Sequence, residues 1–199
     1  MSKPVNKKQL RQVLRHQRRV LPAALKTQMA AQIAEHFFTL SEFQHSQHIA
    51  YYLPHDGEVN PYFIVAQSEK NNKRGYLPII TDVHSLEFYA YRPGEALKKN
   101  RFGIGEPDIT SQHRISARDL DIVLLPLVAF DEQGNRIGRG AGYYDRTFAF
   151  LHDPNSPNKP ILVGLAYEFQ KIPRFQPEAW DITLNMIVTE QKVYRSYSA

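Results

Sequence analysis

The sequence predicts an α/β protein of three layers, with helices on both faces of a mostly parallel or mixed central sheet. Two observations support this class. Segments with helical periodicity alternate along the chain with short runs rich in β-branched and aromatic residues. Residues 121–130, DIVLLPLVAF, are almost continuously apolar, which is typical of a central strand covered on both faces. A length of 199 residues with 42% hydrophobic positions fits one domain, 1–199, on which the helical segment 1–40 packs.

Two helices are expected at the start of the chain. The first covers residues 7–21, and its predicted inner face holds Leu10, Val13, Leu14, Gln17 and Leu21. The second begins at Pro22 and ends near Leu40, because apolar residues recur every four positions at Leu25, Met29, Ile33 and Phe37. This stripe predicts a helix packed on the sheet.

The remaining elements follow from composition and turn residues. Helices are expected at 60–69, capped by Asn60, and at 143–151. Strands are expected at 48–53, 75–80, 86–91, 121–130, 161–166 and 186–189. Residues 92–120 contain several Gly and Pro and little periodicity, so they are expected to form a long loop of the functional or mobile kind.

The positive charge is concentrated in one segment. The chain has 25 Lys and Arg and 20 Asp and Glu, a net charge of +5. Residues 1–19 carry seven basic residues and no acid, so this segment is +7 and the rest is 18 − 20 = −2. Its partner could be nucleic acid, an anionic surface or the phosphates of a small ligand. Arg15, Arg18 and Arg19 are expected to be solvated or to attract an anionic part of a ligand.

Composition excludes several other classes. Without cysteine the chain has no disulfide framework, thiolate zinc site or Cys nucleophile. No apolar run reaches the roughly 18 residues of a membrane span, and residues 1–20 lack the apolar core of a signal peptide. The eight histidines show no metal-ligand spacing. A cytoplasmic location and no membrane partner are therefore expected.

The most specific motif is the glycine-rich stretch Gly134 to Arg146, GNRIGRGAGYYDR. It follows the most apolar predicted strand and precedes a predicted helix, so its backbone N–H groups could bind phosphate. Arg136 and Arg139 could add guanidinium contacts. The spacing matches neither the Walker A loop nor the dinucleotide fingerprint. The alternative is a hairpin turn at 131–135 followed by a strand and a helix.

Three carboxylates could complete such a site. Asp145 and Asp181, if they converge, would suit Mg²⁺ bridging phosphates. Glu58 follows the first predicted strand, at a strand end where ligands collect in α/β sheets. Each also has a structural alternative: Asp145 as a helix first-turn acid, Asp181 as a turn former and Glu58 as a solvated loop acid.

Four separated segments resemble the 5-formyltetrahydrofolate cyclo-ligase family, also called methenyltetrahydrofolate synthetases. They are Lys7 to Arg11, Leu53 to Glu58, Pro126 to Arg146, and Trp180-Asp181 with Ile187 to Glu190. The resemblance spans nearly the whole chain in order, and the glycine-rich segment ending in Tyr-Tyr-Asp-Arg is its specific part. It implies Mg²⁺- and ATP-dependent closure of 5-formyltetrahydrofolate to 5,10-methenyltetrahydrofolate, through a phosphorylated formyl intermediate, with release of ADP and phosphate.

The resemblance also implies roles for individual residues. ATP contacts fall on Lys7, Lys8, Arg11, Arg136, Ile137, Gly138, Arg139, Gly140, Ala141, Gly142, Tyr143 and Tyr144. Substrate contacts fall on Leu53, Glu58, Phe102, Arg139, Gly140, Ala141, Gly142 and Tyr143. Asp145 and Asp181 match the Mg²⁺ ligands, and Arg139, Glu58 and Tyr143 are the expected catalytic residues.

One position departs from the family pattern. Some members carry Lys where this chain has Ala141, so neutralisation of phosphate would rest on Arg139, Arg136, Lys7 and Arg11. The expected partners are ATP and a folate with or without polyglutamate, and the expected state is a monomer. Two alternatives remain open: a nucleic-acid-binding protein using the basic helix, and another phosphate-ligand enzyme on the same architecture. The first is disfavoured by the absence of an interleaved aromatic set.

Overall fold

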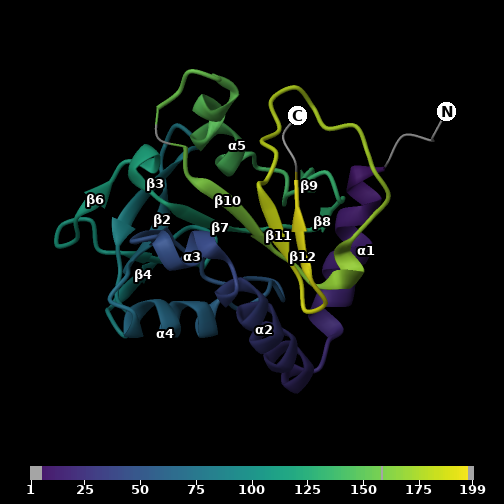
Figure 1. Ribbon diagram of the computed structural model, residues 1–199, viewed down its shortest axis with the longest axis horizontal. Helices are drawn as coiled ribbons and strands as arrows, with labels where there is room; N and C mark the ends of the chain where they lie inside the picture. The colour runs from purple at the N-terminus through teal and green to yellow at the C-terminus, as the bar shows by residue number, and fades with distance from the viewer. Residues whose placement is uncertain (1–5, 158, 197–199) are drawn as a thin grey trace.

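The computed structural model describes residues 6–157 and 159–196, so Lys3 of the basic segment lies outside it. Eight strands form one sheet in the order β12-β11-β10-β7-β1-β2-β3-β6 (Figure 1). The central strands are all parallel: β11 (Met186–Val188), β10 (Ile161–Leu165), β7 (Ile122–Pro126), β1 (His48–Ala50) and β2 (Arg74–Ile80). At the edges, β12 (Val193–Arg195), β3 (Leu86–Ala90) and β6 (Arg114–Ile115) pair antiparallel. The predicted α/β class is confirmed, with a mixed sheet whose centre is parallel.

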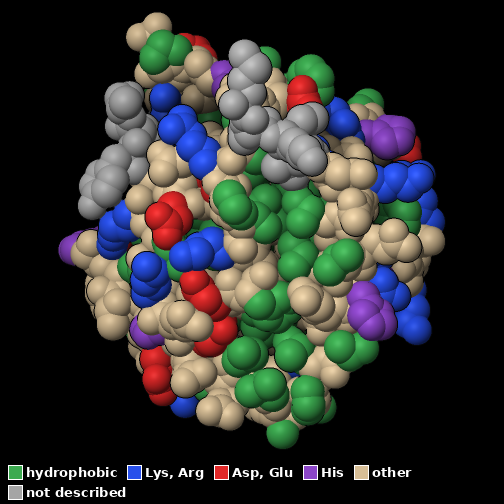
Figure 2. Space-filling view, turned by 90° about the vertical axis from the view of Figure 1, so that its right-hand side faces the viewer, with side chains coloured by type: hydrophobic (Ala, Val, Ile, Leu, Met, Phe, Trp, Pro, Cys, Tyr) green, Lys and Arg blue, Asp and Glu red, His purple; other side chains and the backbone are tan. Residues whose placement is uncertain are grey.

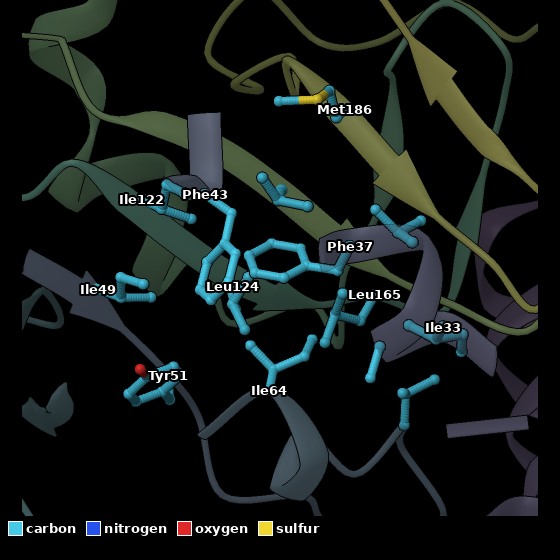
Figure 3. Packing of buried hydrophobic residues seen from close by; sticks show 14 of the residues in the cluster. Ile33, Phe37, Phe43, Ile49, Tyr51, Ile64, Ile122, Leu124, Leu165 and Met186 are labelled. Atoms are coloured by element: carbon cyan, nitrogen blue, oxygen red, sulfur yellow. The ribbon is translucent and has the colours of Figure 1, made fainter. Parts of the chain in front are cut away.

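Helices cover both faces of this sheet. On one face lie α2 (Ala23–Phe38), α3 (Ser41–His45) and α4 (Tyr62–Lys70), whose Phe37, Phe43 and Ile64 point onto the strands (Figure 3). On the other face Phe148 follows α5 (Tyr143–Thr147) and precedes a 3-10 helix, Ala149–His152. In β7, Ile122 and Leu124 belong to the same buried cluster as Phe37, Phe43 and Ile64. Val123 and Leu125 belong to the cluster on the other face, with Phe148. This two-sided burial explains the continuous apolar run.

The basic helix α1 (Lys7–Val20) packs beside the short hairpin of β8 (Ala129–Phe130) and β9 (Arg136–Ile137). It begins after Asn6, whose side-chain Oδ1 accepts a hydrogen bond from the Gln9 N–H at 3.1 Å. The predicted inner face is partly wrong. Val13 is 48% exposed and Gln17 is exposed, whereas Leu14 and Arg18 are buried. The inner stripe runs instead through Lys7, Arg11, Leu14 and Arg18, where the leucine packs in the core and the three cations meet partners in the protein.

Residues 92–120 are not one long loop, so that prediction is wrong. They contain β4 (Leu97–Lys99) and β5 (Gly105–Pro107), which pair with each other, then β6 and the 3-10 helix Ala117–Asp119. These strands are two or three residues long and half polar, so no alternation was visible in the sequence. The segment packs against the sheet edge formed by β2 and β3.

Three further boundaries differ from expectation. The predicted strand 121–130 is two strands: β7 ends at Pro126, since proline has no N–H to donate within a sheet, and β8 begins at Ala129. The predicted helix 143–151 is α-helical only to Thr147. Helix α3 and strand β12 were not expected, because five and three residues are too short to show a period. None of the helices in the described part of the chain is long and apolar enough to cross a bilayer.

Candidate functional site

One large cavity, of about 850 Å³, opens at the carboxyl ends of the neighbouring strands β1, β2 and β7. This is the edge of an open α/β sheet at which ligands bind, and the volume suits a small organic molecule. The cavity contains every residue assigned above to ATP, substrate or metal, with one exception. Lys8 is exposed and does not line it.

The glycine-rich loop forms one wall of this cavity. Gly140 and Gly142 have φ angles of 107° and 68°, a region that L side chains rarely adopt, so glycine is required there. Arg11 donates from Nε to the Gly138 carbonyl oxygen at 2.8 Å and lies against Gly140. Helix α1 therefore closes onto the loop, and the two sequence features predicted to bind phosphate adjoin each other.

Asp145 is held in place by groups from two other segments. Its Oδ1 accepts from Arg136 Nη2 at 2.7 Å and from the Ile182 N–H at 3.2 Å. Arg136 also donates to the Ile182 carbonyl oxygen and is 8% exposed. The guanidinium predicted to contact phosphate is thus bound to the carboxylate predicted to bind metal.

The mouth of the cavity combines a lysine with two carboxylates. Lys7 Nζ lies 3.1 Å from Glu178 Oε1 and 3.6 Å from Asp181 Oδ2. The same Oδ2 accepts from the Glu178 N–H at 3.0 Å. Trp180, 66% exposed, lies at this edge of the cavity. Residues 171 positions apart in the sequence, Lys7 and Glu178, therefore meet at one entrance.

Two carboxylates of the cavity could hold a cation together with bound phosphate. Hydrogen bonds from described residues reach Oδ1 of Asp145 and Oδ2 of Asp181, so each keeps its second oxygen for another ligand. Mg²⁺ takes one or two protein carboxylates and completes its shell with phosphate oxygens and water, so this donor set fits it. Among the described residues, no three His, Cys, Asp or Glu side chains converge on a self-sufficient metal site.

A buried ionic cluster lies at the floor of the cavity, where the turn after β1 meets α1. Glu58 is 6% exposed, and its Oε2 accepts from the His55 N–H at 3.1 Å. Burial raises the pKa of Glu58, although the positive charge of Arg18 opposes the rise. The structural alternative for Glu58, a solvated loop acid, is therefore wrong.

Asp56 is the shared ion-pair partner of Arg15, Arg18 and Arg19. Its Oδ2 lies 2.5 Å from Arg15 Nε and its Oδ1 lies 3.0 Å from Arg19 Nε. Burial opposes ionisation of Asp56, but the hydrogen bond and charge of Arg15, with Arg19 and Arg18, hold its pKa below the usual range. Arg18 is only 1% exposed, so the expectation that it is solvated is wrong.

Two aromatic side chains that touch each other, Phe102 and Tyr143, also line the cavity. Phe102 packs edge-on against Tyr143 with ring centroids 6.5 Å apart, and it is 46% exposed. The turn that presents Phe102 is held by Asn100, whose Oδ1 accepts from the N–H groups of Phe102 and Ile104 at 2.8 and 3.1 Å. Asn100 was not expected to matter. The pattern N-x-x-x-I before a glycine gave only a weak sign of this turn.

The charge distribution argues against a nucleic-acid surface on α1. Figure 2, which looks at the side carrying α1, shows Lys and Arg side chains directly beside Asp and Glu side chains. Arg15, Arg18 and Arg19 pair with Asp56, and Lys7 pairs with Glu178. Four of the six described cations of this segment therefore lie against carboxylates rather than in an open cationic patch.

The fold and the site together define an α/β protein in which a glycine-rich loop and several cations line a cavity of the size that small organic molecules occupy. A model described as the 5-formyltetrahydrofolate cyclo-ligase family matches residues 3–190, and the chain belongs to that family. The family resemblance read from the sequence is confirmed.

Curated relatives and a solved structure agree with this assignment. The chain is 36% identical to a 5-formyltetrahydrofolate cyclo-ligase of Haemophilus influenzae over 89% of this chain and 94% of the relative. It is 34% identical to one of Escherichia coli over 92% and 99%. The NMR structure of Aquifex aeolicus 5,10-methenyltetrahydrofolate synthetase is 32% identical with a TM-score of 0.82, covering 98% of this chain and 95% of that one.

Proposed function

We propose that the chain converts 5-formyltetrahydrofolate into 5,10-methenyltetrahydrofolate in an ATP-dependent reaction that releases ADP and phosphate. The observation that carries the proposal is the joining of two unlike surfaces in one cavity. One surface has glycine-rich backbone and the cations of α1, and the other has a buried carboxylate between aromatic side chains. Membership of the family supports the same activity.

The phosphates of ATP are proposed to lie on the glycine-rich loop. Residues 138–142, Lys7, Arg11 and Arg139 line this part of the cavity, and their backbone N–H groups and cationic side chains are the proposed phosphate contacts. They would neutralise charge that spreads over the transferring phosphoryl group. Arg136, which is bonded to Asp145, would act by holding that carboxylate. Asp145 and Asp181 would hold Mg²⁺, whose charge would further neutralise the phosphates when it is bound.

The pterin of the folate is proposed to lie over Leu53 between Glu58 and Phe102. Glu58 Oε1 would accept hydrogen bonds from N–H groups of the pterin, and Tyr143 would lie where the folate meets the phosphates. Phe102 would cover the ring.

The chemistry needs positioning and charge neutralisation more than a protein nucleophile. The formyl oxygen attacks the γ-phosphorus of ATP, and the bond to ADP breaks, which gives an iminium phosphate in which the phosphorylated formyl carbon is doubly bonded to N5. N10 then attacks the formyl carbon and loses its proton, and expulsion of phosphate leaves the methenyl bridge. Arg139 is the side chain proposed to stay with the phosphate through both steps.

The test is the appearance of the methenyl chromophore when the purified protein is mixed with ATP, Mg²⁺ and 5-formyltetrahydrofolate. We expect turnover by the wild-type chain and a severe loss in Asp145→Asn. Asp153→Asn, a change at an exposed loop carboxylate outside the cavity, is the matched control and should keep full activity. No absorbance change from the wild-type chain, where a known relative is active, would overturn the proposal.

A further inference from the structure

The proposed function leaves one buried charge unexplained. Arg18 lies on the inner stripe of α1, is 1% exposed and donates from Nη1 to the Leu127 carbonyl oxygen at 2.8 Å. Its Nε and Nη2 have no hydrogen-bond partner among the described residues. Buried polar groups are normally satisfied, so a guanidinium with two open donors next to a ligand cavity calls for a reason.

Glu58 is the open acceptor that faces this arginine. Its Oε1 is buried without a hydrogen-bond partner in the described chain and lies 4.0 Å from Arg18 Nη2. Its Oε2 is bonded to the His55 N–H, so Oε1 is the oxygen left for a ligand. Glu58 lines the cavity and Arg18 does not.

Asp56 does not relieve Arg18 of this role. It is closer to Arg18, at 3.7 Å, but it is already paired with Arg15 at 2.5 Å and Arg19 at 3.0 Å. Among the described residues, Arg18 is the single ion-pair partner of Glu58. The charge of Arg18 is therefore the one available to balance the carboxylate at the floor.

The turn that carries Glu58 rests directly on α1 at Arg18. Gly57 has a φ of 74°, and a Cβ there would lie 2.8 Å from the Arg18 carbonyl oxygen. Asp56 also has a positive φ, of 57°. A backbone this tightly docked fixes the position of Glu58 relative to Arg18, and the side chain has little room to move away.

We propose that Arg18 is a positioning residue for the folate site: from behind the cavity wall it keeps the Glu58 carboxylate charged and directed so that Oε1 accepts N–H donors of the bound pterin. The inference rests on the proposed function. Other charged or titratable groups facing Glu58 are His55 and Asp56 on its own turn, Tyr52 after β1, Tyr144 on α5 and Arg139 on the glycine-rich loop. Of the cations, Arg18 acts on Glu58 most strongly.

The first test is the titration of the Glu58 carboxyl by NMR of protein labelled with ¹³C at glutamate, assigned with Glu58→Gln. In Arg18→Met we expect the titration midpoint to rise by about one pH unit or more, because an opposite charge at this range lowers a carboxyl pKa by that amount. Arg18→Lys should restore part of the difference. Arg19→Met is the matched control, a neighbouring arginine paired with Asp56 but not with Glu58, and should leave the midpoint in place. An unchanged midpoint in Arg18→Met overturns the proposal.

The second test compares kinetic effects in two backgrounds. Arg18→Met should raise KM for the folate about tenfold, the loss expected for one charge-assisted hydrogen bond, and change KM for ATP less than about twofold. In a Glu58→Gln background the same substitution should have little further effect on KM for the folate. An equal effect in both backgrounds would show a merely structural role.

A third measurement keeps Arg18 in place, since an uncharged side chain at this buried position can itself prevent folding. The Nε–H resonance of Arg18 in ¹⁵N-labelled protein should shift in Glu58→Gln relative to wild type, and an unaffected resonance contradicts the proposal. Neither NMR experiment requires turnover. An inactive wild-type chain would overturn the proposed function, and the coupling between Arg18 and Glu58 would still be measured.

Discussion

The mouth and the floor of the cavity use the same residue types for opposite purposes. At the mouth, Lys7 and Glu178 have side chains that are 27% and 50% exposed. At the floor, the side chains of Arg18, Glu58 and Asp56 are 1%, 4% and 8% exposed. Solvated ion pairs contribute little and exchange partners readily, whereas separating buried charges is costly. At the mouth, Lys7 can therefore leave Glu178 and pair with a ligand. At the floor, Arg18, Glu58 and Asp56 keep fixed positions.

One helix serves both regions. Lys7 and Arg11 lie in the first turns of α1, Leu14 packs in the middle, and Arg18 lies near its end. The rise along a helix separates positions 7 and 18 by about 16 Å, so a single helix extends from the mouth to the floor. Helix α1 turns Lys7, Arg11 and Arg18 toward the protein and Val13 toward solvent, so the same helix contributes to both the mouth and the floor.

The largest expected effect concerns the loop between the regions. Arg139→Ala should lower kcat about 100- to 1000-fold, as for removal of one preorganised transition-state donor, with a smaller change in either KM. Single-turnover formation of the methenyl product is the measurement. Arg174→Ala, at an exposed arginine outside the cavity, is the control and should be unaffected. A change confined to KM would mean that Arg139 binds the ground state only.

Removing a charge from the floor should lower the free energy of unfolding. Asp56→Asn should lower the free energy of unfolding at pH 7 by about 2 kcal/mol, because it leaves Arg15, Arg18 and Arg19 without their shared carboxylate. Asn accepts a positive φ, so the substitution isolates the charge.

The pH dependence of this difference has a definite sign. The pKa of Asp56 in the folded chain lies below its ordinary value of 3.8, so the stabilisation is present above that pH and is lost as pH falls through the folded pKa. Urea denaturation should therefore give curves for Asp56→Asn and wild type that approach each other below about pH 4. A difference that widens on acidification would contradict the ion-pair account.

Removing the cation of the mouth should weaken the binding of ATP. Lys7→Met should raise KM for ATP about tenfold and leave the free energy of unfolding nearly unchanged, because its nearest partner, Glu178, is half exposed. The adjacent Lys8→Met should change KM for ATP less than about twofold, since Lys8 lies outside the cavity. Equal effects of the two substitutions would favour the sequence prediction, which gave both lysines to ATP.

The smallest expected effect is on the acidic side of the pH profile of kcat/KM for the folate. Burial raises the pKa of Glu58, so the carboxylate should protonate at a pH above its ordinary value of 4.5 as the solution is acidified. The ratio kcat/KM for the folate should fall through this higher range, and Glu58→Gln should remove that limb. A limb at or below the ordinary value would show that Glu58 does not control folate binding.

Much of the fold was readable because the period and the burial agree. The stripe Leu25, Met29, Ile33 and Phe37 predicted α2, and the continuous apolar run predicted β7. The region 92–120 was not readable, since strands of two or three residues are specified by pairing with distant partners rather than by their own pattern.

The site was predicted where a local motif or the family pattern carried it. The glycine-rich loop, Asp145, Asp181 and Glu58 do line one cavity. The roles of Arg18 and Asp56 were missed, because a basic helix looks solvated when only its periodicity is considered. The contacts of Arg18 with the Leu127 carbonyl oxygen and with the turn at Gly57, which join distant parts of the sequence, show that this part of the helix is buried.

The most direct test of the division between mouth and floor uses the single tryptophan of the chain, Trp180, which lines the cavity and directly precedes Asp181, an ion-pair partner of Lys7. Titration with ATP and Mg²⁺ should change its fluorescence and yield a dissociation constant. We predict that Lys7→Met weakens this constant about tenfold and that Glu58→Gln leaves it within about twofold. A constant that responds to Glu58→Gln and not to Lys7→Met would contradict the assignment of nucleotide to the mouth and folate to the floor.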